Sequence, residues 1–254
     1  MSKPTIVIIP GSFSVPAQYE GLAEQLRSYG FETIVGPLQS AGRRDPLPAA
    51  TMQDDAAYFS EVITNLANEG KEIVLLPHSY GGVVANESAK GLLKSDRLAN
   101  GQPGGIIRIV FISSVVPPEG LSTADLAVDL SLDEFITVDG DYMIMKIGDE
   151  AIKANFADIS PEEALPLAKM YTDHSTKSFA DKLTFAAYKY VPVSFIFCER
   201  DGTLPPDFQR KTIARIEEAS GREVQVLSID SGHCPAATRP EETAGLVRMA
   251  IGQN

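Results

Sequence analysis

The sequence predicts an α/β fold in which helices cover both faces of a mostly parallel β-sheet. Three observations indicate this class. Short apolar runs rich in Val, Ile and Leu alternate with longer segments whose apolar residues recur at helical spacing. Loops with Gly, Pro and polar residues follow these runs directly, at the edge where open parallel sheets gather their sites. With 254 residues, 44% of them apolar, the chain suits one such domain.

The first half of the chain follows the alternation. A strand is expected at 5–9, and the helix after it over 16–28 stops at Gly30. The pattern then predicts a strand at 31–35, a Pro- and Gly-rich loop at 36–50, a helix at 51–66, a strand from 72 to 79 and a helix at 83–93.

The second half departs from the alternation once. A buried strand is expected at 106–116, and the pattern resumes only at 191. It then predicts a strand at 191–198, a helix at 207–219, a strand at 223–229 and a helix at 240–251, with Thr238 and Glu241 at capping-box spacing. We therefore expect one domain over residues 1–254, with a core of 1–116 and 191–254 and an insertion of about 117–190.

Ser79 is the predicted nucleophile. A strand pattern ends at this serine and a helical pattern begins at Val83, so Ser79 lies on a sharp strand-to-helix turn. Gly81 and Gly82 fit this turn, because β-carbons there would clash with nearby backbone. The usual motif is G-x-S-x-G, and Pro77 stands here in place of its first glycine.

His233 is the predicted base among the three histidines. It follows the strand at 223–229 on a loop from which its ring can turn toward Ser79. His78 adjoins the serine on the same turn and cannot easily turn back, so we expect it to pack or hydrogen-bond beneath the turn. His174 lies in a polar stretch of the insertion, where it is either a surface residue or a substrate contact.

Asp201 is the predicted acid that orients the base. It follows the strand at 191–198, and the order Ser79, Asp201, His233 is the chain order of this kind of triad on an α/β sheet. Glu119, after the preceding strand, is the alternative acid. The other acidic residues near these loops fit structural roles better: Glu199, Asp207 and Asp230.

The backbone amides of Ser12 and Tyr80 are the predicted donors of an oxyanion hole. Such donors are needed where negative charge develops on an acyl oxygen. Gly11 follows the strand at 5–9 and lets the chain turn so that the amide of Ser12 faces Ser79. Tyr80 directly follows the nucleophile.

Together these motifs resemble the α/β-hydrolase superfamily, and within it the small esterases grouped with plant methylesterases, hydroxynitrile lyases and their microbial relatives. The likeness spans essentially the whole chain and is carried by Ile8-Ile9-Pro10-Gly11-Ser12-Phe13, Leu76-Pro77-His78-Ser79-Tyr80-Gly81-Gly82, Phe197-Cys198-Glu199-Arg200-Asp201 and Ser231-Gly232-His233. Most relatives have histidine where Pro10 stands and glycine where Pro77 stands. Neither position is a predicted triad member, so these differences concern loop geometry.

The resemblance implies that the insertion 117–190 forms a helical cap over the nucleophile. We expect a small-molecule substrate, an apolar ester, to bind beneath this cap, with methionines and aromatic residues forming an adaptable apolar roof. The candidate substrate-binding residues are Phe13, Met143, Tyr171 and His174.

The implied reaction is hydrolysis of a small carboxylic ester by Ser79, His233 and Asp201 through an acyl-enzyme. A lyase on the same scaffold is an alternative. Plant lyases of this type have a threonine in the oxyanion turn and a lysine after the histidine, where this chain has Gly11 and Cys234. Two further alternatives are a pathway enzyme that uses the triad for cyclisation or carbon–carbon cleavage, and a ligand-binding, receptor-like protein.

Composition restricts partners and location. The net charge of −12 argues against a nucleic-acid partner, which needs a basic face, and fits a cytoplasmic enzyme. The sequence predicts no membrane span and no secretory peptide. Cys198 and Cys234 are expected to be reduced, buried thiols. We expect no metal and no organic cofactor, and the sequence leaves open whether the chain forms a homodimer.

Overall fold

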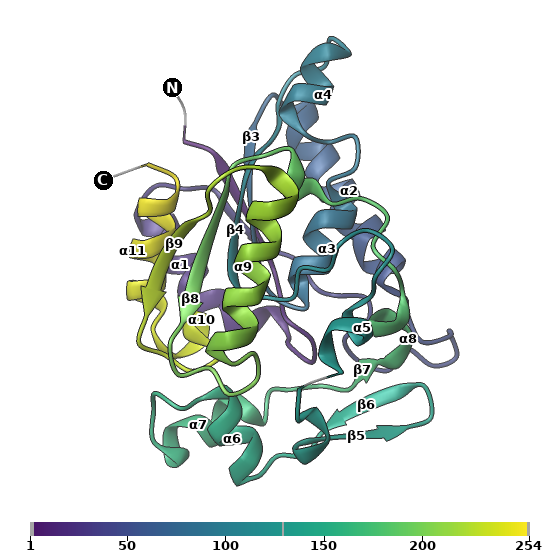
Figure 1. The fold of residues 1–254 in the computed structure, drawn as a ribbon, viewed down its shortest axis with the longest axis vertical. Coiled ribbons are helices and arrows are strands. Elements are labelled where there is room, and N and C mark those ends of the chain that lie inside the picture. The colour runs from purple at the N-terminus through teal and green to yellow at the C-terminus, as the bar shows by residue number, and fades with distance from the viewer. Residues whose placement is uncertain (1–2, 129, 253–254) are drawn as a thin grey trace.

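The computed structural model describes residues 3–128 and 130–252. Within them the central feature is a parallel sheet of six strands in the order β2-β1-β3-β4-β8-β9 (Figure 1). This confirms the predicted fold class. The strands are β1 (Thr5–Ile9), β2 (Thr33–Val35), β3 (Glu72–Ser79), β4 (Gly105–Ser114), β8 (Val193–Cys198) and β9 (Gln225–Ile229).

Helices cover both faces of this sheet (Figure 1). One face is covered by α1 (Glu20–Ser28), which follows a 3₁₀ turn at Pro16–Tyr19, together with α10 (Pro235–Thr238) and α11 (Pro240–Ala250). The other face is covered by α2 (Met52–Asn68), α3 (Gly81–Ser88) and α9 (Pro206–Ser220). The short helix α4 (Lys94–Ala99) leads into β4.

The inner strands β1, β3, β4 and β8 are mainly apolar because both of their faces are buried, whereas the edge strand β9 is largely exposed. Successive side chains of a strand point to opposite faces. In β1, Ile6 and Ile8 pack with α1 and α11, whereas Val7 and Ile9 pack with α2 and α3. The continuous apolar runs of the sequence are therefore the signature of a sheet covered on both sides.

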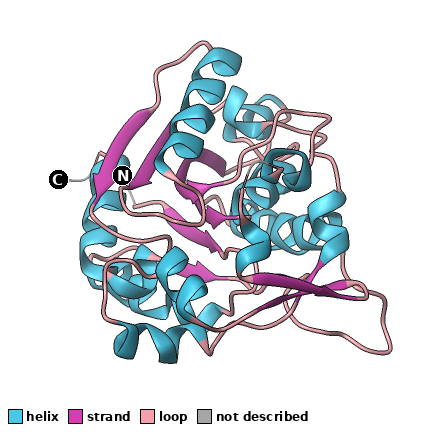
Figure 2. Cartoon of the chain, turned by 60° about the horizontal axis from the view of Figure 1, so that its bottom comes forward, coloured by secondary structure: helices cyan, strands magenta, loops and turns pink. Residues whose placement is uncertain are grey.

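The segment between β4 and β8 contains short helices and also a small antiparallel sheet, β5-β6-β7, which lies apart from the central sheet in Figure 2. The expectation of a helical cap did not include this sheet. A hairpin turn at Gly140 (φ +58°) joins its first two strands. The elements are α5 (Thr123–Ala127), a 3₁₀ turn (Leu132–Glu134), β5 (Ile136–Asp139), β6 (Tyr142–Met145), α6 (Asp149–Asn155), α7 (Pro161–Ala168), β7 (His174–Ser175), α8 (Thr176–Ala180) and a 3₁₀ turn (Ala187–Lys189).

Most predicted boundaries lie within a few residues of the observed ones, but the predicted capping box of the last helix is wrong. The residue before α11 is Arg239, which makes no side-chain cap. Thr238 ends the preceding helix α10 instead, and its hydroxyl donates to the Cys234 carbonyl at 3.3 Å.

The loops after β8 and β9 dock onto the segment between β4 and β8. The amide of Gly202 donates to the carbonyl of Ala154 at 3.1 Å, and that of Gly232 donates to Asp158 at 2.8 Å. Across the parts of the chain that the structure describes, none of the helices combines the length and apolarity needed to cross a membrane.

Candidate active site

Ser79 lies on the sharp turn between β3 and α3. Its φ is +53°, a left-handed conformation that a non-glycine residue adopts only where its surroundings enforce it. One enforcing contact is the amide of Val115, which donates to the Ser79 carbonyl at 2.9 Å. The strained turn aims the side chain of a buried serine out of the sheet edge.

Gly81 and Gly82 allow this turn to pack against its neighbours. A β-carbon at Gly81 would lie 2.4 Å from the Ile9 carbonyl oxygen, and one at Gly82 would lie 2.4 Å from that of Val115. Both neighbours are backbone atoms that cannot move aside cheaply. The geometry confirms why the sequence has glycine at both positions.

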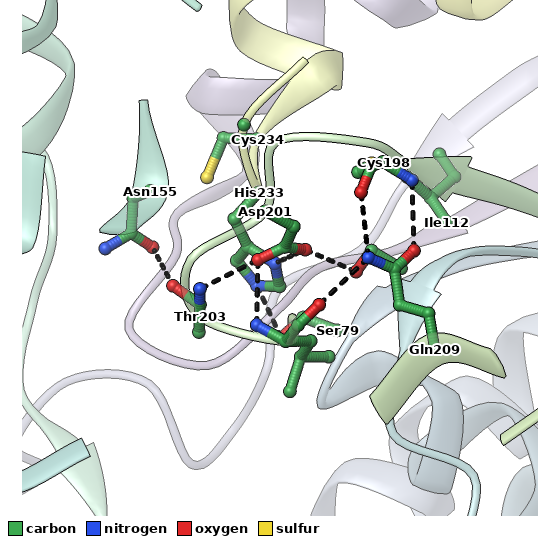
Figure 3. Close-up of polar contacts among 12 residues, drawn as sticks. Ser79, Ile112, Asn155, Cys198, Asp201, Thr203, Gln209, His233 and Cys234 are labelled. Carbon is green, nitrogen blue, oxygen red and sulfur yellow. Dashed lines mark hydrogen bonds and ion pairs between the residues drawn. The ribbon is translucent and has the colours of Figure 1, made fainter. Parts of the chain in front are cut away.

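Ser79, His233 and Asp201 form one hydrogen-bonded chain (Figure 3). The Ser79 Oγ lies 2.9 Å from His233 Nε2, and His233 Nδ1 lies 2.7 Å from Asp201 Oδ2. In the neutral imidazole, Nδ1–H donates to the carboxylate, which leaves the Nε2 lone pair to accept from the serine hydroxyl. The structure thus brings together the three residues that the sequence singled out as a triad.

The Asp201 carboxylate is buried and fully hydrogen-bonded. Its Oδ1 accepts from the amides of Thr203 and Leu204 at 2.8 and 2.7 Å, and its Oδ2 accepts from the Ser113 hydroxyl at 2.5 Å. Gln209 of α9 ties the loop to β8 through both backbone groups of Cys198 (Figure 3). These bonds supply the partners that a buried carboxylate needs.

His78 forms a second chain beneath the turn, as predicted. Its Nε2–H donates to the His233 carbonyl at 2.7 Å, so its Nδ1 accepts from the Tyr19 hydroxyl at 2.7 Å. The Tyr19 oxygen in turn accepts from the amide of Gly11 at 2.8 Å. Burial, followed by the neighbouring His233, holds the pKa of His78 well below its usual value, so this ring is neutral.

The amides of Ser12 and Tyr80 are the candidate oxyanion donors, and both residues line the same pocket as Ser79. On either side of Ser12, the Gly11 amide bonds the Tyr19 hydroxyl and the Phe13 amide bonds His174 Nδ1. Among the described residues, the amides of Ser12 and Tyr80 have no acceptor. Both N–H groups are therefore available to an oxygen atom placed above Ser79.

A pocket opens above these groups, and its empty space, including the solvent at its mouth, is about 590 Å³. The predicted residues Phe13 and Tyr171 line it. Its polar lining includes Asn155 and Thr203, and the Tyr171 hydroxyl donates to Asn155 Oδ1 at 3.3 Å. The rest is mainly apolar: Phe13, Val115, Ala127, Leu130, Leu132, Phe135, Ile136, Met145, Phe179 and Leu204.

His174 and Met143 were also expected to contact substrate, and their positions in the structure correct that expectation. Neither is part of the pocket lining. Met143 pairs with His174 in the small sheet, and Met145, two residues along the same face of β6, lines the pocket instead. His174 is fully buried behind Phe13 and Tyr80, with ring centroids 5.4 and 5.0 Å away.

Two other expectations can be compared with the structure. Glu119, the alternative acid, lies in a partly exposed ion pair with Lys189 at 3.0 Å and accepts from the amide of Ala186. Cys198 and Cys234 are free, buried thiols. Burial raises the pKa of Cys234 to about 12 and that of Cys198 well above its usual value.

Sequence reasoning missed the residues that support this site. Tyr19 lies within the segment predicted as a helix at 16–28, and Ser113 lies within a strand pattern in which nothing distinguishes it. Asn155, Thr203 and Gln209 carry no motif. Their roles depend on which loops meet in space, and no signal in a single sequence reports that.

Comparison with known proteins agrees with the fold. Residues 6–246 match the model of the alpha/beta hydrolase family. The chain is similar to a protein named "Probable hydrolase R7" from a Phoma species, with 32% identity over 260 residues that cover 99% of this chain and 100% of that one. It is also similar to polyneuridine aldehyde esterase from Rauvolfia serpentina, with 24% identity over 85% of this chain and 84% of that one.

Solved structures give the same picture of the fold. A crystal structure of polyneuridine aldehyde esterase superposes with a TM-score of 0.75 at 22% identity, covering 98% of this chain and 99% of that one. An extracellular alpha/beta-hydrolase from a Paenibacillus species superposes with a TM-score of 0.74 at 19% identity, covering 98% and 99% of the two chains. The family model matches residues 6–246, almost the whole of this chain, and the chain has a strained serine turn at the sheet edge. The chain therefore belongs to the alpha/beta hydrolase family.

Proposed function

We propose that this protein is a serine esterase that hydrolyses small, apolar carboxylic esters. The observation that carries the proposal is the unbroken hydrogen-bonded chain from the Ser79 hydroxyl through His233 to Asp201 at the floor of an apolar pocket. The names of related proteins, which include methylesterases and an aldehyde esterase, support ester chemistry as the class.

In the proposed mechanism, Ser79 Oγ attacks the ester carbonyl while His233 Nε2 takes the hydroxyl proton. Asp201 keeps the Nδ1–H tautomer and stabilises the imidazolium that forms. The amides of Ser12 and Tyr80 donate to the oxyanion. Collapse of the tetrahedral intermediate releases the alcohol, which takes the proton from His233. Water then repeats the sequence to release the acid.

The pocket supports an uncharged, largely apolar substrate. Among the described lining residues there is no Lys, Arg, Asp or Glu side chain, so nothing there would pair with a charged substrate group. The lining is instead dominated by Leu, Ile, Met and Phe side chains, which favour apolar acyl or alkoxy groups. Tyr171, Asn155 and Thr203 offer the few polar contacts that would orient a bound ester.

The test is turnover of p-nitrophenyl esters from acetate to octanoate by the wild type and by Ser79→Ala. Loss of the nucleophile is expected to lower kcat by about 10⁶-fold, because the residual rate comes from binding and the oxyanion donors alone. Ser95→Ala, an exposed serine on α4, is the matched control and keeps wild-type turnover.

Comparable turnover by wild type and Ser79→Ala would refute the proposed nucleophile. If the folded wild type hydrolyses none of these esters, the esterase proposal fails. Turnover of mandelonitrile would then identify a lyase, and tight binding without turnover would identify a ligand-binding protein.

A further inference from the structure

Phe13, next to the candidate oxyanion donor Ser12, has a strained backbone that two contacts hold in place. Its φ is +63°, a left-handed conformation that is strained for a non-glycine residue. Its amide donates to His174 Nδ1 at 3.3 Å, and its carbonyl accepts from the amide of Thr172 at 2.9 Å. Both partners come from the segment between β4 and β8, so this segment fixes the shape of the turn after β1.

The protonation of His174 follows from its partners. Since Nδ1 accepts from an amide, the ring proton lies on Nε2. Nε2 faces the Ser178 hydroxyl oxygen at 3.1 Å, and Ser178 gives its own proton to the carbonyl of Ser175 at 2.8 Å. Burial lowers the pKa of His174 to about 3, in agreement with a neutral ring.

The same network reaches the second candidate donor. The Tyr80 hydroxyl donates to Asp55 Oδ2 at 2.8 Å, and the Ser40 hydroxyl donates to the same oxygen at 2.6 Å. The Ser40 hydroxyl oxygen also lies 3.4 Å from His174 Nε2. Phe13, which follows the candidate donor Ser12, and Tyr80, whose amide is the second candidate donor, are therefore joined through one buried polar network.

We propose that His174 is a positioning residue that aims the Ser12 amide at the oxyanion by holding the backbone of Phe13. Relaxation of φ at Phe13 would rotate the peptide group between Ser12 and Phe13. That rotation would shift the neighbouring donor, the amide of Ser12. His174 does not line the pocket, so its effect is on the transition state rather than on substrate binding. This inference rests on the proposed esterase function.

Two conservative variants separate the two ring nitrogens. In His174→Asn, the side-chain oxygen takes the place of Nδ1 and keeps an acceptor for the Phe13 amide. In His174→Gln, the amide group reaches the Nε2 position and keeps the contact with Ser178, but the Phe13 amide loses its acceptor. We expect His174→Gln to lower kcat by about 10- to 100-fold with KM changed by less than about 2-fold, less than the ~10²–10³ of a deleted donor. His174→Asn is expected to stay within about 3-fold of the wild-type kcat.

A second pair tests the backbone strain. Glycine adopts positive φ without cost, whereas alanine does not. Phe13→Gly is therefore expected to restore part of the kcat of His174→Gln, by about 5-fold, while Phe13→Ala leaves it unrestored. Both substitutions remove the same ring from the pocket, so their difference reports the backbone alone.

Hydrogen exchange of the Phe13 amide provides a readout that does not depend on turnover. Exchange is expected to be slow in the wild type and His174→Asn, and at least about 10-fold faster in His174→Gln, because only that variant frees the amide. If Gln retains kcat and Asn loses it, or if exchange at Phe13 is equal in all three proteins, the inference is overturned. If the wild type hydrolyses no ester while the exchange pattern holds, the esterase proposal fails and the role of His174 in holding Phe13 stands.

Discussion

At the scale of single residues, Asp201 shows how a buried charge is placed beside a histidine. Two amides, one hydroxyl and His233 Nδ1 surround its carboxylate. In the proposed mechanism only one of these partners, His233, takes part in the reaction. The other three hold the carboxylate in one orientation, so that Oδ2 remains aimed at His233.

Asp201→Asn is expected to lower kcat by about 10⁴-fold with little change in fold, because an amide nitrogen facing Nδ1 favours the wrong imidazole tautomer. Steady-state kinetics with a p-nitrophenyl ester checks this. Glu119→Gln is the matched control, since Glu119 only pairs with Lys189 and the amide of Ala186, and it should stay within about 2-fold of wild type. A larger loss in Glu119→Gln than in Asp201→Asn would reverse the assignment of the acid.

The sequence was informative about residues whose position along the chain determines their place in space. Ser79, Asp201 and His233 each follow a strand, and parallel strands bring such positions to one edge. The sequence was uninformative about residues such as Tyr19 and Ser113, which support the site through hydrogen bonds, because a hydrogen bond between distant segments leaves no local pattern in the sequence. His174 belongs to this second group: its polar neighbours predicted exposure or a ligand, whereas three aromatic side chains and Ser178 enclose it.

At the scale of elements, the turn between β3 and α3 depends on how closely α3 approaches the ends of β1 and β4. The backbone oxygens of Ile9, the last residue of β1, and of Val115, just after β4, lie against Gly81 and Gly82. The helix is buried along its whole length, so it cannot shift outward to relieve a clash.

Gly81→Ala is expected to lower the free energy of unfolding by about 1–3 kcal/mol, because its methyl group would overlap the Ile9 and Pro10 carbonyl oxygens. Gly245→Ala in α11 is the control: nothing lies within 4 Å of its added β-carbon, and alanine favours a helix by up to about 1 kcal/mol. Urea denaturation of both variants measures the difference. Equal effects of the two substitutions would contradict the close packing of the turn.

Elements were predictable where burial imposes a regular pattern and less so elsewhere. The strands of the central sheet read clearly because both faces are apolar. The strands β5 and β6 are short and partly exposed, and β7 has two residues, both buried, so none of the three is long enough to show a strand period. The small sheet is therefore recognised only from the pairing of its strands in three dimensions.

At the scale of the whole molecule, buried titratable groups have opposite effects on stability as the pH changes. His78 and His174 are neutral when folded, mainly because burial lowers their pKa values. Below pH 6.5 these histidines become protonated in the unfolded chain, whereas the buried rings of the folded chain stay neutral. The free energy of unfolding therefore falls as the pH falls. Asp55 has the opposite effect. Burial, partly offset by hydrogen bonds from Ser40, raises its pKa to about 6. Acidification from pH 6 toward 4 therefore protonates a buried carboxylate and raises the free energy of unfolding.

Comparison of the wild type with His174→Asn isolates the contribution of His174 to the pH dependence of stability. Between pH 6.5 and 5, the free energy of unfolding of the wild type is expected to fall by about 2 kcal/mol relative to the variant, which carries no ionisable group there. Denaturation curves at several pH values measure this difference. Asp55→Asn should give a slope of opposite sign between pH 6 and 4, and a pH-independent difference for His174→Asn would show that the ring is not buried neutral.

The division of the pocket between two parts of the chain has a consequence for how such enzymes diversify. The proposed reacting groups Ser79, Asp201 and His233 lie at or just after the ends of strands of the central sheet, whereas most of the apolar lining comes from residues 115–179. Substitutions within that stretch can change which esters fit and leave the chemistry untouched. In the proposed positioning role, His174 is the exception, because it lies in this stretch and yet accepts from the amide of Phe13, next to the candidate donor Ser12. If His174 has the proposed positioning role, replacing residues 115–179 by the corresponding segment of another hydrolase will preserve the oxyanion donors only when that segment carries an equivalent acceptor for the Phe13 amide.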